Sequence, residues 1–463
     1  MKLLTSFSRS ISIITLSVLG LTACGSDDDN DNTSITPPLV EISEAEIRVI
    51  HAGSDAPLVD VLANGSSFVD DVDYAMSSGL TTVPSGNYAV AVDAQLPDGT
   101  TTTVLTADLD AEADVEYTAV ALGNVADNSL MLKLIANPEQ EIADNYARVQ
   151  VLHASPAVGL VDIYVTEPGA DISMMQPTLS ANYMDASPQL EIPAADYQIR
   201  ITASGDKGVV YDSGSVPLAD EGDYFISAIP NTGSGMSPVA LLVALPEGQL
   251  LLNDKSSGSD IRVVHAVADA PAVDVFLDGS TTAAVTNLMF KGIAGYVNIP
   301  EGEHTATVAA NVDNNIIVID KAPFELALGD SYSILAVGSL TDNDIEPWII
   351  MESPRKVATE AKLTVSHAAY SAPNVDIYLT ASDDIANATP ALSDVPFKAS
   401  SGSLSVAGGD YVVSVTVAGT KNVAIGPLAI SLDSGGIYGV AAVDTDTSGV
   451  FDVILLDDFV STE

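Results

Sequence analysis

The sequence has few basic residues, few aromatic residues and a single cysteine. Sixteen Lys and Arg stand against 63 Asp and Glu in 463 residues, which gives a formal net charge of −47. This excess of acid excludes a nucleic-acid-binding protein, whose affinity depends on a basic surface that displaces counterions. Aromatic residues make up only 5%, with one Trp, which argues against the stacking platforms of carbohydrate-binding modules. A single cysteine allows no disulfide within the chain.

Common catalytic motifs are also absent from the sequence. It contains no G-x-S-x-G, no H-E-x-x-H and no glycine-rich phosphate loop, so hydrolase, zinc-protease and nucleotide-binding functions lack support. Asp444, Asp446, Ser448 and Gly449 imitate the start of an EF-hand loop, but Leu455 stands where that loop needs Glu. We interpret this segment as a hairpin turn, with calcium binding as the alternative. The sequence thus predicts no catalytic residue, no cofactor and no metal site.

The apolar run at the N-terminus is too short to span a membrane. It covers residues 11–21, about 11 residues against the roughly 20 that a spanning helix needs, and it follows Lys2 and Arg9. This pattern predicts a signal peptide over residues 1–23. The run ends in Leu-Thr-Ala-Cys, which resembles the lipobox of bacterial lipoproteins. That resemblance implies that Cys24 carries a diacylglyceryl group and becomes the mature N-terminus, which attaches the protein to a membrane.

The segment behind Cys24 is polar and acidic. Cleavage there removes two bases and leaves 63 acids against 14 bases, a net charge of −49. Residues 24–45 begin with a run of Asp and Asn that buries nothing and repels itself, so we expect an extended tether. A calcium-binding loop is the alternative. Gly25 stands where an Asp commonly retains lipoproteins in the inner membrane, which implies transfer to the outer membrane if the host is Gram-negative.

The remainder of the chain contains one phrase four times, and 47% hydrophobic residues provide ample apolar surface for folding. The phrases are IRVIHAGSDAPLVDVLANG, RVQVLHASPAVGLVDIYV, IRVVHAVADAPAVDVFLDG and LTVSHAAYSAPNVDIYLT. In each, a His is followed nine residues later by an Asp. The four pairs are His51 and Asp60, His153 and Asp162, His265 and Asp274, and His367 and Asp376.

The repeats alternate between two types. The first and third phrase His are 214 residues apart, as are the second and fourth. The second and fourth repeats share a further segment, PTLSANYMDAS and PALSDVPFKAS, that the others lack. We therefore read the order as A-B-A-B, produced by duplication of a two-domain unit.

Short alternating runs rich in Val, Ile and Thr, with turn residues every 8 to 12 positions, predict about seven antiparallel strands per repeat. The fold class is therefore all-β, with four tandem antiparallel β-sandwich domains of immunoglobulin-like type. The predicted domains are A1 (46–137), B1 (145–245), A2 (260–352) and B2 (362–460). The phrase resembles the start of the bacterial family called domain of unknown function 4397, found in secreted proteins and lipoproteins, and nearly all of 46–460 resembles it as four copies. The resemblance implies an extracytoplasmic β-domain and no activity. The second copy departs from it by placing Pro156 three residues after its His.

Strand parity places each phrase His on the core side. Two registers of a hairpin between the His strand and the Asp strand are open. In one, Asp60 lies opposite His51 and orients its imidazole. In the other, which buries more apolar surface and which we favour, Val59 and Val61 face the core. Asp60 then points outward beside Arg48. We interpret the His and Asp residues as structural, with a catalytic or metal site as the alternative.

These features predict a lipid-anchored binding or scaffold protein of the cell envelope, attached to the outer membrane and without catalytic activity. Its partner is a protein or polymer at the cell surface and not a strong polyanion, because the negative charge repels one. The alternatives are a structural or adhesive surface protein with calcium-dependent stability and a hydrolase of unknown type.

Overall fold

The computed structural model describes residues 43–460, and this part of the chain consists of strands, turns and loops without a helix. Residues 43–460 lie within one compact unit. The predicted signal peptide (1–23), Cys24 and most of the predicted tether lie outside the described residues. The first strand begins at Glu44, two residues before the predicted start of A1. Residues 43–460 contain no helix that is long and apolar enough to span a membrane.

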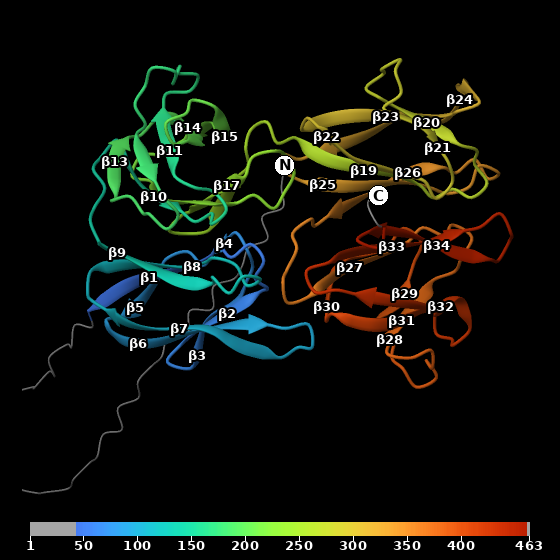
Figure 1. Ribbon diagram of the computed structural model, residues 1–463, viewed down its shortest axis with the longest axis horizontal. Helices are drawn as coiled ribbons and strands as arrows, with labels where there is room; N and C mark the ends of the chain where they lie inside the picture. Colours follow the sequence, from blue (N-terminus) through green and yellow to red (C-terminus); the bar gives the residue numbers. More distant parts are fainter. Residues whose placement is uncertain (1–42, 461–463) are drawn as a thin grey trace, which may run out of the picture. The chain divides into compact units, whose positions relative to one another are not determined.

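Each repeat folds into two facing sheets, so the predicted all-β sandwich fold and its repetition are confirmed (Figure 1). The strands of A1 are β1 (Glu44–His51), β2 (Val59–Ala63), β3 (Ser66–Val72), β4 (Met76–Ser77), β5 (Thr81–Pro84), β6 (Gly86–Gln95), β7 (Thr101–Ala111), β8 (Val115–Leu122) and β9 (Met131–Pro138). The strands of A2 are β19 (Ser259–His265), β20 (Val273–Leu277), β21 (Val285–Leu288), β22 (Ile293–Ile299), β23 (Gly302–Ala310), β24 (Asp313–Leu326), β25 (Ser331–Val337) and β26 (Glu346–Glu352).

The B repeats have the same plan, and B1 gains one further edge strand, β18, beyond its predicted end. The strands of B1 are β10 (Tyr146–His153), β11 (Val161–Thr166), β12 (Leu179–Ala181), β13 (Leu190–Pro193), β14 (Asp196–Ala203), β15 (Val209–Pro217), β16 (Asp223–Pro230), β17 (Val239–Ala244) and β18 (Gln249–Leu252). The strands of B2 are β27 (Ala361–His367), β28 (Val375–Thr380), β29 (Leu392–Val395), β30 (Ser400–Val406), β31 (Gly409–Val417), β32 (Val423–Leu432), β33 (Ile437–Asp444) and β34 (Phe451–Asp457).

One strand pair in each sandwich runs parallel, which differs from the expected antiparallel sheets. β1 pairs parallel with β8, and the same pairing joins β10 with β16, β19 with β25 and β27 with β33. In A1 the connection from β7 to β8 lies beside the start of β1, where the Asp114 N–H donates to the Glu44 carbonyl at 2.9 Å. Because β8 sets out from the end where β1 begins, the two strands run in the same direction.

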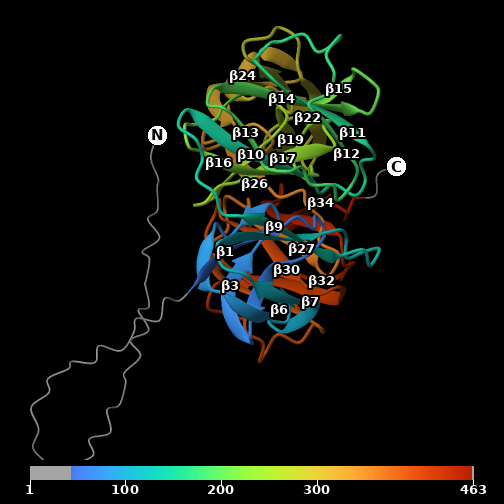
Figure 2. The ribbon, with the colours of Figure 1, turned by 90° about the vertical axis from the view of Figure 1, so that its left-hand side faces the viewer.

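The A and B sandwiches pack together through the sheets that contain the His strands. In β1, Ile47 and Val49 face the A1 core, whereas Ile50 faces B1. The A1–B1 interface consists of Ile50, Ala52, Val120, Leu122 and Ile135 against Leu152, Ala154, Phe225, Ile229, Ala240, Leu242 and Ala244. Figure 2 shows the blue A1 strands and the green B1 strands stacked in this way. Since both faces of these strands are covered, their sequences read as nearly continuous apolar runs.

The A2–B2 interface repeats this packing with Val264, Ala266, Leu335, Val337 and Ile350 against Ala368, Ala441, Val443, Ile454 and Leu456. Each interface also contains a buried Arg from its A domain. Arg48 donates to Glu116 at 2.6 Å and lies over the Phe225 ring at 5.1 Å. Arg262 stands at the equivalent position in A2 but has different partners, pairing with Glu352 of A2 and Asp457 of B2 and lying over the Tyr296 ring of A2. The two A–B pairs therefore share an apolar and cationic interface.

Fewer contacts join one A–B pair to the other. Arg355, in the segment between A2 and B2, donates to the Ala56 carbonyl at 2.8 Å and to Asp73 at 2.5 Å. On the B1 side, the Ser234 N–H donates to the Gly329 carbonyl at 2.9 Å. These contacts are polar, whereas the contacts within each pair form an apolar core.

Candidate functional site

The four phrase His residues end the first strand of each sandwich and are buried. His51 and His153 are 1% exposed, and His265 and His367 are 2% exposed. Each ring bonds through Nε2 to the carbonyl six residues later, which bridges the strand end to the loop that follows. These carbonyls belong to Pro57 (3.0 Å), Gly159 (3.1 Å), Pro271 (3.0 Å) and Pro373 (3.2 Å).

The other ring nitrogen accepts from the backbone in three of the four copies. Nδ1 receives the N–H two residues later, from Gly53 at 3.3 Å, Ser155 at 3.4 Å and Val267 at 3.3 Å. This network assigns the neutral tautomer with its proton on Nε2. Nδ1 of His367 is buried without a hydrogen-bond partner. Burial lowers the pKa of His51, His265 and His367, which agrees with neutral rings.

An aromatic ring completes each of these sites. An aromatic ring stands nearly perpendicular to each imidazole in a T-shaped contact with 6.3–6.4 Å between centroids, from Tyr74, Tyr183, Phe290 and Phe397. The residue after each aromatic has a positive φ, at Ala75, Met184, Lys291 and Lys398. Its N–H donates to the carbonyl of the phrase His at 2.8–2.9 Å. We call the His, the aromatic residue and the residue after it the His corner.

Sequence reasoning missed the His corner, although a signal was present. The aromatic follows its His by 30 residues in both B repeats and lies in the segment shared by them. In the A repeats the spacing is 23 and 25 residues. The positive φ falls on Ala, Met and Lys, which are not typical of that conformation, so turn propensities gave no indication of it.

The hairpin predicted between the His strand and the Asp strand is wrong. β1 and β2 lie in different sheets, because the loop after His51 crosses from one sheet to the other. Val59 and Val61 do face the core, as the favoured register required. Asp60, however, is not beside Arg48, which bonds to Glu116 and Thr118 in the sheet that contains β8.

The phrase Asp residues lie on β2, β11, β20 and β28 and hold neighbouring loops. Asp60 accepts from the Asp71 N–H at 3.0 Å, and Asp274 accepts from the Asn287 N–H at 2.8 Å. In the B repeats, Asp162 and Asp376 accept from the N–H groups of Gly205 and Gly419, both at 2.8 Å. Hydrogen bonds from the Ser180 hydroxyl and the Gly205 N–H lower the pKa of Asp162, and the bond from the Asn287 N–H lowers the pKa of Asp274. His and Asp therefore do not converge, and each is engaged by hydrogen bonds of its own.

Metal binding is the remaining candidate chemistry of residues 43–460. No group of three or more His, Cys, Asp and Glu side chains suited to a metal ion occurs there. The EF-hand-like segment connects β33 and β34, which form an antiparallel hairpin. The Asp444 carboxylate accepts from the hydroxyl of Ser371 in the loop after the phrase His.

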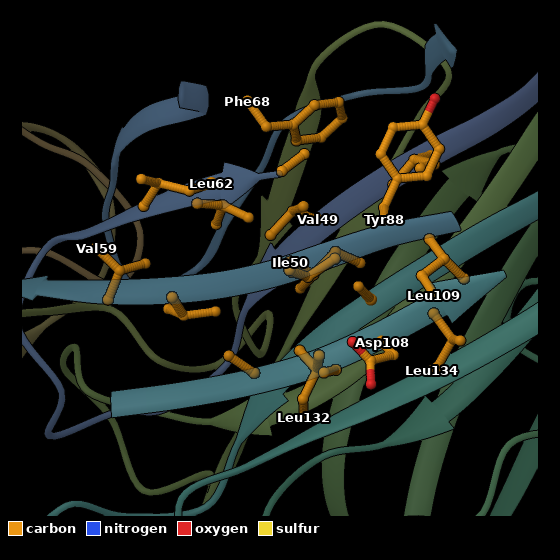
Figure 3. Close-up of a pocket in the computed structure, with 18 of the residues that line it drawn as sticks. Val49, Ile50, Val59, Leu62, Phe68, Tyr88, Asp108, Leu109, Leu132 and Leu134 are labelled. Atoms are coloured by element: carbon orange, nitrogen blue, oxygen red, sulfur yellow. The ribbon is translucent and has the colours of Figure 1, made fainter. Parts of the chain in front are cut away.

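A1 contains an apolar cavity of about 60 Å³ between its two sheets. Figure 3 shows it surrounded by side chains from both sheets, including Phe68, Tyr88, Leu109, Leu132 and Leu134. Ala119 borders this cavity at a position where the other sandwiches have larger residues. The register equivalents of Ala119 are Ile226 in B1, Ile334 in A2 and Val440 in B2. The cavity thus lies where A1 lacks a β-branched side chain.

Two clefts open where domains meet. One, of about 490 Å³, lies between A2 and B2, and its Glu352 and Asp457 already bind Arg262. The other, of about 430 Å³, lies between A1 and B2, and we call it the A1–B2 cleft. Its walls include Arg355 and Lys362, two of only 16 basic residues in the chain. Both clefts have the size range of small-ligand sites, which commonly form between domains.

Comparison with known proteins identifies one family. A family model described as domain of unknown function (DUF4397) matches residues 45–164 and 259–378, more than half of the chain. Each matched segment spans an A sandwich and the first part of the following B sandwich, and the two segments are offset by the 214 residues that separate the A repeats. No curated protein matches the chain.

Proposed function

The chain belongs to the DUF4397 family, whose description assigns no activity, and we propose that it is a lipid-anchored binding or scaffold protein of the cell envelope without catalytic activity. The lipobox carries the anchoring part of this proposal. Leu21-Thr22-Ala23-Cys24 follows a short apolar run with basic residues before it, and Cys24 is the single cysteine of the chain. Gly25 after it supports the outer membrane as the destination in a Gram-negative host.

The geometry favours binding over chemistry. The His corners use the ring nitrogens to hold the backbone, and the phrase Asp residues lie in the opposite sheet, so neither group is free to act on a substrate. Each A–B pair, in contrast, packs over an apolar core, and clefts open between A2 and B2 and between A1 and B2. A preformed cleft is suited to binding because little ordering is needed.

Anchoring is tested by mass spectrometry and fractionation of the native protein. The mature N-terminal peptide should begin at Cys24 and carry diacylglycerol, and Cys24→Ala should release the protein from the membrane fraction. Gly25→Asp is the matched variant for destination, because it keeps the lipid and should move the protein to the inner membrane. A Cys24→Ala protein that stays equally membrane-bound contradicts the proposal.

Binding is tested by screening the purified full chain against envelope polymers, surface proteins and calcium. Retention of a polymer or protein supports the proposal, and turnover of any substrate that a point mutation abolishes would overturn it. A calcium-dependent melting temperature would favour the adhesive alternative instead.

A further inference from the structure

The two B domains have a basic residue at the same strand position but in different surroundings. Arg148 and Lys362 each stand five residues before the phrase His and are 5% and 8% exposed. In B1, Arg148 lies between two carboxylates on the flanking strands. Asp223 on β16 is 3.5 Å away and Glu191 on β13 is 3.8 Å away, so the protein itself balances this buried charge.

B2 lacks both of these carboxylates. The strand registers place Ile437 where B1 has Asp223 and Ser405 where B1 has Glu191. Among residues 43–460, no carboxylate forms an ion pair with Lys362. Its ammonium donates one long hydrogen bond, to the Ser353 hydroxyl at 3.3 Å, which leaves donors unused. A buried cation with no carboxylate at ion-pair distance is costly, so this position favours an anion from outside the chain.

Lys362 lines the A1–B2 cleft, whose other charges are already engaged or are acidic. Arg355 is bonded to Asp73 at 2.5 Å, so that pair is balanced. Glu360, which is 6% exposed, accepts from the Ser405 hydroxyl at 2.8 Å. Burial and the nearby Arg355 lower the pKa of Lys362, while Asp73 and Glu360 act in the opposite direction. The Lys362 ammonium and the Glu360 carboxylate of the cleft therefore have no ion-pair partner among the described residues.

The rest of the wall is mostly apolar or hydroxylic, and Gln95 adds an amide that already donates to Asp60 and Asp71. Pro57, Leu58, Leu96 and Pro97 of A1 line one side, and Ser403 of B2 lies opposite. A ligand with a carboxylate, an ammonium and an apolar side chain matches each part of this wall. A zwitterion also avoids the repulsion that a chain with a net charge of −47 exerts on free anions.

We propose that the A1–B2 cleft binds a small zwitterion, an α-amino acid with an apolar side chain, whose carboxylate takes the position relative to Lys362 that Asp223 and Glu191 take relative to Arg148. Its ammonium faces Glu360, and its side chain lies against Leu58 and Leu96. This inference rests on the proposed binding function, because it names the ligand class of one cleft.

Calorimetric titration of the detergent-purified full chain with three probes tests the proposal. L-leucine has both charged groups, N-acetyl-L-leucine retains the carboxylate alone, and L-leucinamide retains the ammonium alone. Leucine should bind best, and leucinamide should bind at least about tenfold more weakly because it cannot pair with Lys362. Absence of binding by leucine, or equal binding of leucine and leucinamide, overturns the inference.

Two variants locate the site. Ser405→Glu places a carboxylate beside Lys362, as Glu191 lies beside Arg148 in B1, so it should weaken leucine binding about tenfold or more. Ser405→Gln is its uncharged control and should weaken leucine binding less. Lys362→Gln should also lose leucine binding, whereas Lys356→Gln, an exposed Lys paired with Asp458, should retain it. Leucine binding that survives both Ser405→Glu and Lys362→Gln overturns the inference.

The outcome separates this inference from the proposed function. Leucine binding by a chain that carries no lipid at Cys24 would support the cleft and refute the anchor. A lipidated chain that retains an envelope polymer but ignores all three probes would support the proposed function and refute the cleft.

Discussion

The phrase His of each sandwich connects a strand end, a crossing loop and an aromatic residue from another loop. We expect His265→Ala to lower the free energy of unfolding of A2 by about 1 to 3 kcal/mol, because the Pro271 carbonyl and the Val267 N–H both lose a buried partner. His367→Ala should cost less, since Nδ1 of His367 has no partner. Urea denaturation of both variants measures the difference. Loss of a ligand or an activity with unchanged stability would instead make the His a functional residue.

Protonation of the buried His residues should destabilise the protein in mild acid. The pKa of His51, His265 and His367 lies below the ordinary value of about 6.5, so the unfolded chain takes up protons first. Their stabilisation is present above pH 6.5 and is lost as the pH falls toward the folded-state pKa values. His304 opposes this, because a hydrogen bond to a carboxylate raises its pKa. Between pH 7.5 and 5.5 we expect the stability lost at the three buried His residues to exceed the stability gained at His304.

This pH dependence is measured by urea denaturation at pH 7.5, 6.5 and 5.5. Each buried His contributes at most about 1.4 kcal/mol per pH unit. His265→Gln serves as the control. It should reduce the slope of the free energy of unfolding against pH by the contribution of one His. Burial raises the pKa of Glu116, which acts in the opposite direction, and the comparison with the variant cancels that contribution. Equal slopes for the two proteins would contradict the prediction.

The apolar cavity in A1 predicts that a larger side chain at Ala119 stabilises the protein. Ala119→Val should stabilise the protein by about 1 kcal/mol, because it fills part of the 60 Å³ cavity and valine is the native residue at the equivalent Val440. The reverse change in A2, Ile334→Ala, should cost about 2 to 4 kcal/mol. Calorimetric melting of both variants tests this. Destabilisation by Ala119→Val would show that the neighbouring side chains cannot accept two more methyl groups.

At the scale of strands, sequence patterns predicted the elements better than their partners. The alternation of apolar and polar residues in Val59-Asp60-Val61 correctly predicted that the two valines face the core, because successive side chains of a strand point to opposite faces. The pattern could not distinguish a hairpin from a crossing between sheets, since both reverse the chain within a few residues. The run IRVIH, with Ile50 apolar on the face opposite Val49, carried the signal that both faces are buried. A strand whose sequence is apolar without alternation therefore indicates that a second domain covers the outer face of its sheet.

The same limits apply to the candidate sites. The residues beside Arg148 lie on β13 and β16, and those beside Lys362 lie on β30 and β33. No spacing in the sequence identifies these neighbouring strands, so the difference between the two sites could not be predicted. The repeated His and Asp were visible in the sequence, but their separation into two sheets was not. The resemblance of Leu21-Thr22-Ala23-Cys24 to a lipobox depends on local residue order alone, so this prediction needs no fold, and it stays a prediction because these residues lie outside the described part of the chain.

The apolar interface between A and B sheets gives a prediction about elements. Leu335→Asp puts a carboxylate into the A2–B2 interface, where Leu335 is 1% exposed. We expect a loss of about 3 kcal/mol or more and separate melting of A2 and B2 in calorimetry, because an unpaired buried charge is poorly tolerated. Leu250→Asp, on the half-exposed edge strand β18, is the control and should change little. A single unshifted transition for Leu335→Asp would refute this role of the interface.

The whole molecule is a duplicated pair, in which contacts within a pair differ in kind from contacts between pairs. Within a pair, two sheets bury apolar residues on both sides of a common core. Between pairs, polar bonds such as Arg355 to Asp73 and Ser234 to Gly329 predominate. Interfaces of the second kind resemble transient ones, which are weaker than an apolar core of similar extent.

We therefore expect the A–B pair to be the unit that folds independently. A fragment of residues 43–256 should be a monomer with one cooperative transition, since it keeps the bonds of Asp254 and Lys255 to Asp212 and loses polar contacts to the rest of the chain. A fragment of residues 43–138 should self-associate, because it exposes the apolar face formed by Ile50, Val120 and Leu122. Light scattering after size exclusion distinguishes the two. Adding Val120→Asp to the shorter fragment should restore a monomer by making that face polar. A shorter fragment that is monomeric without this change, and as stable as its domain within the pair, would show that A1 folds without B1.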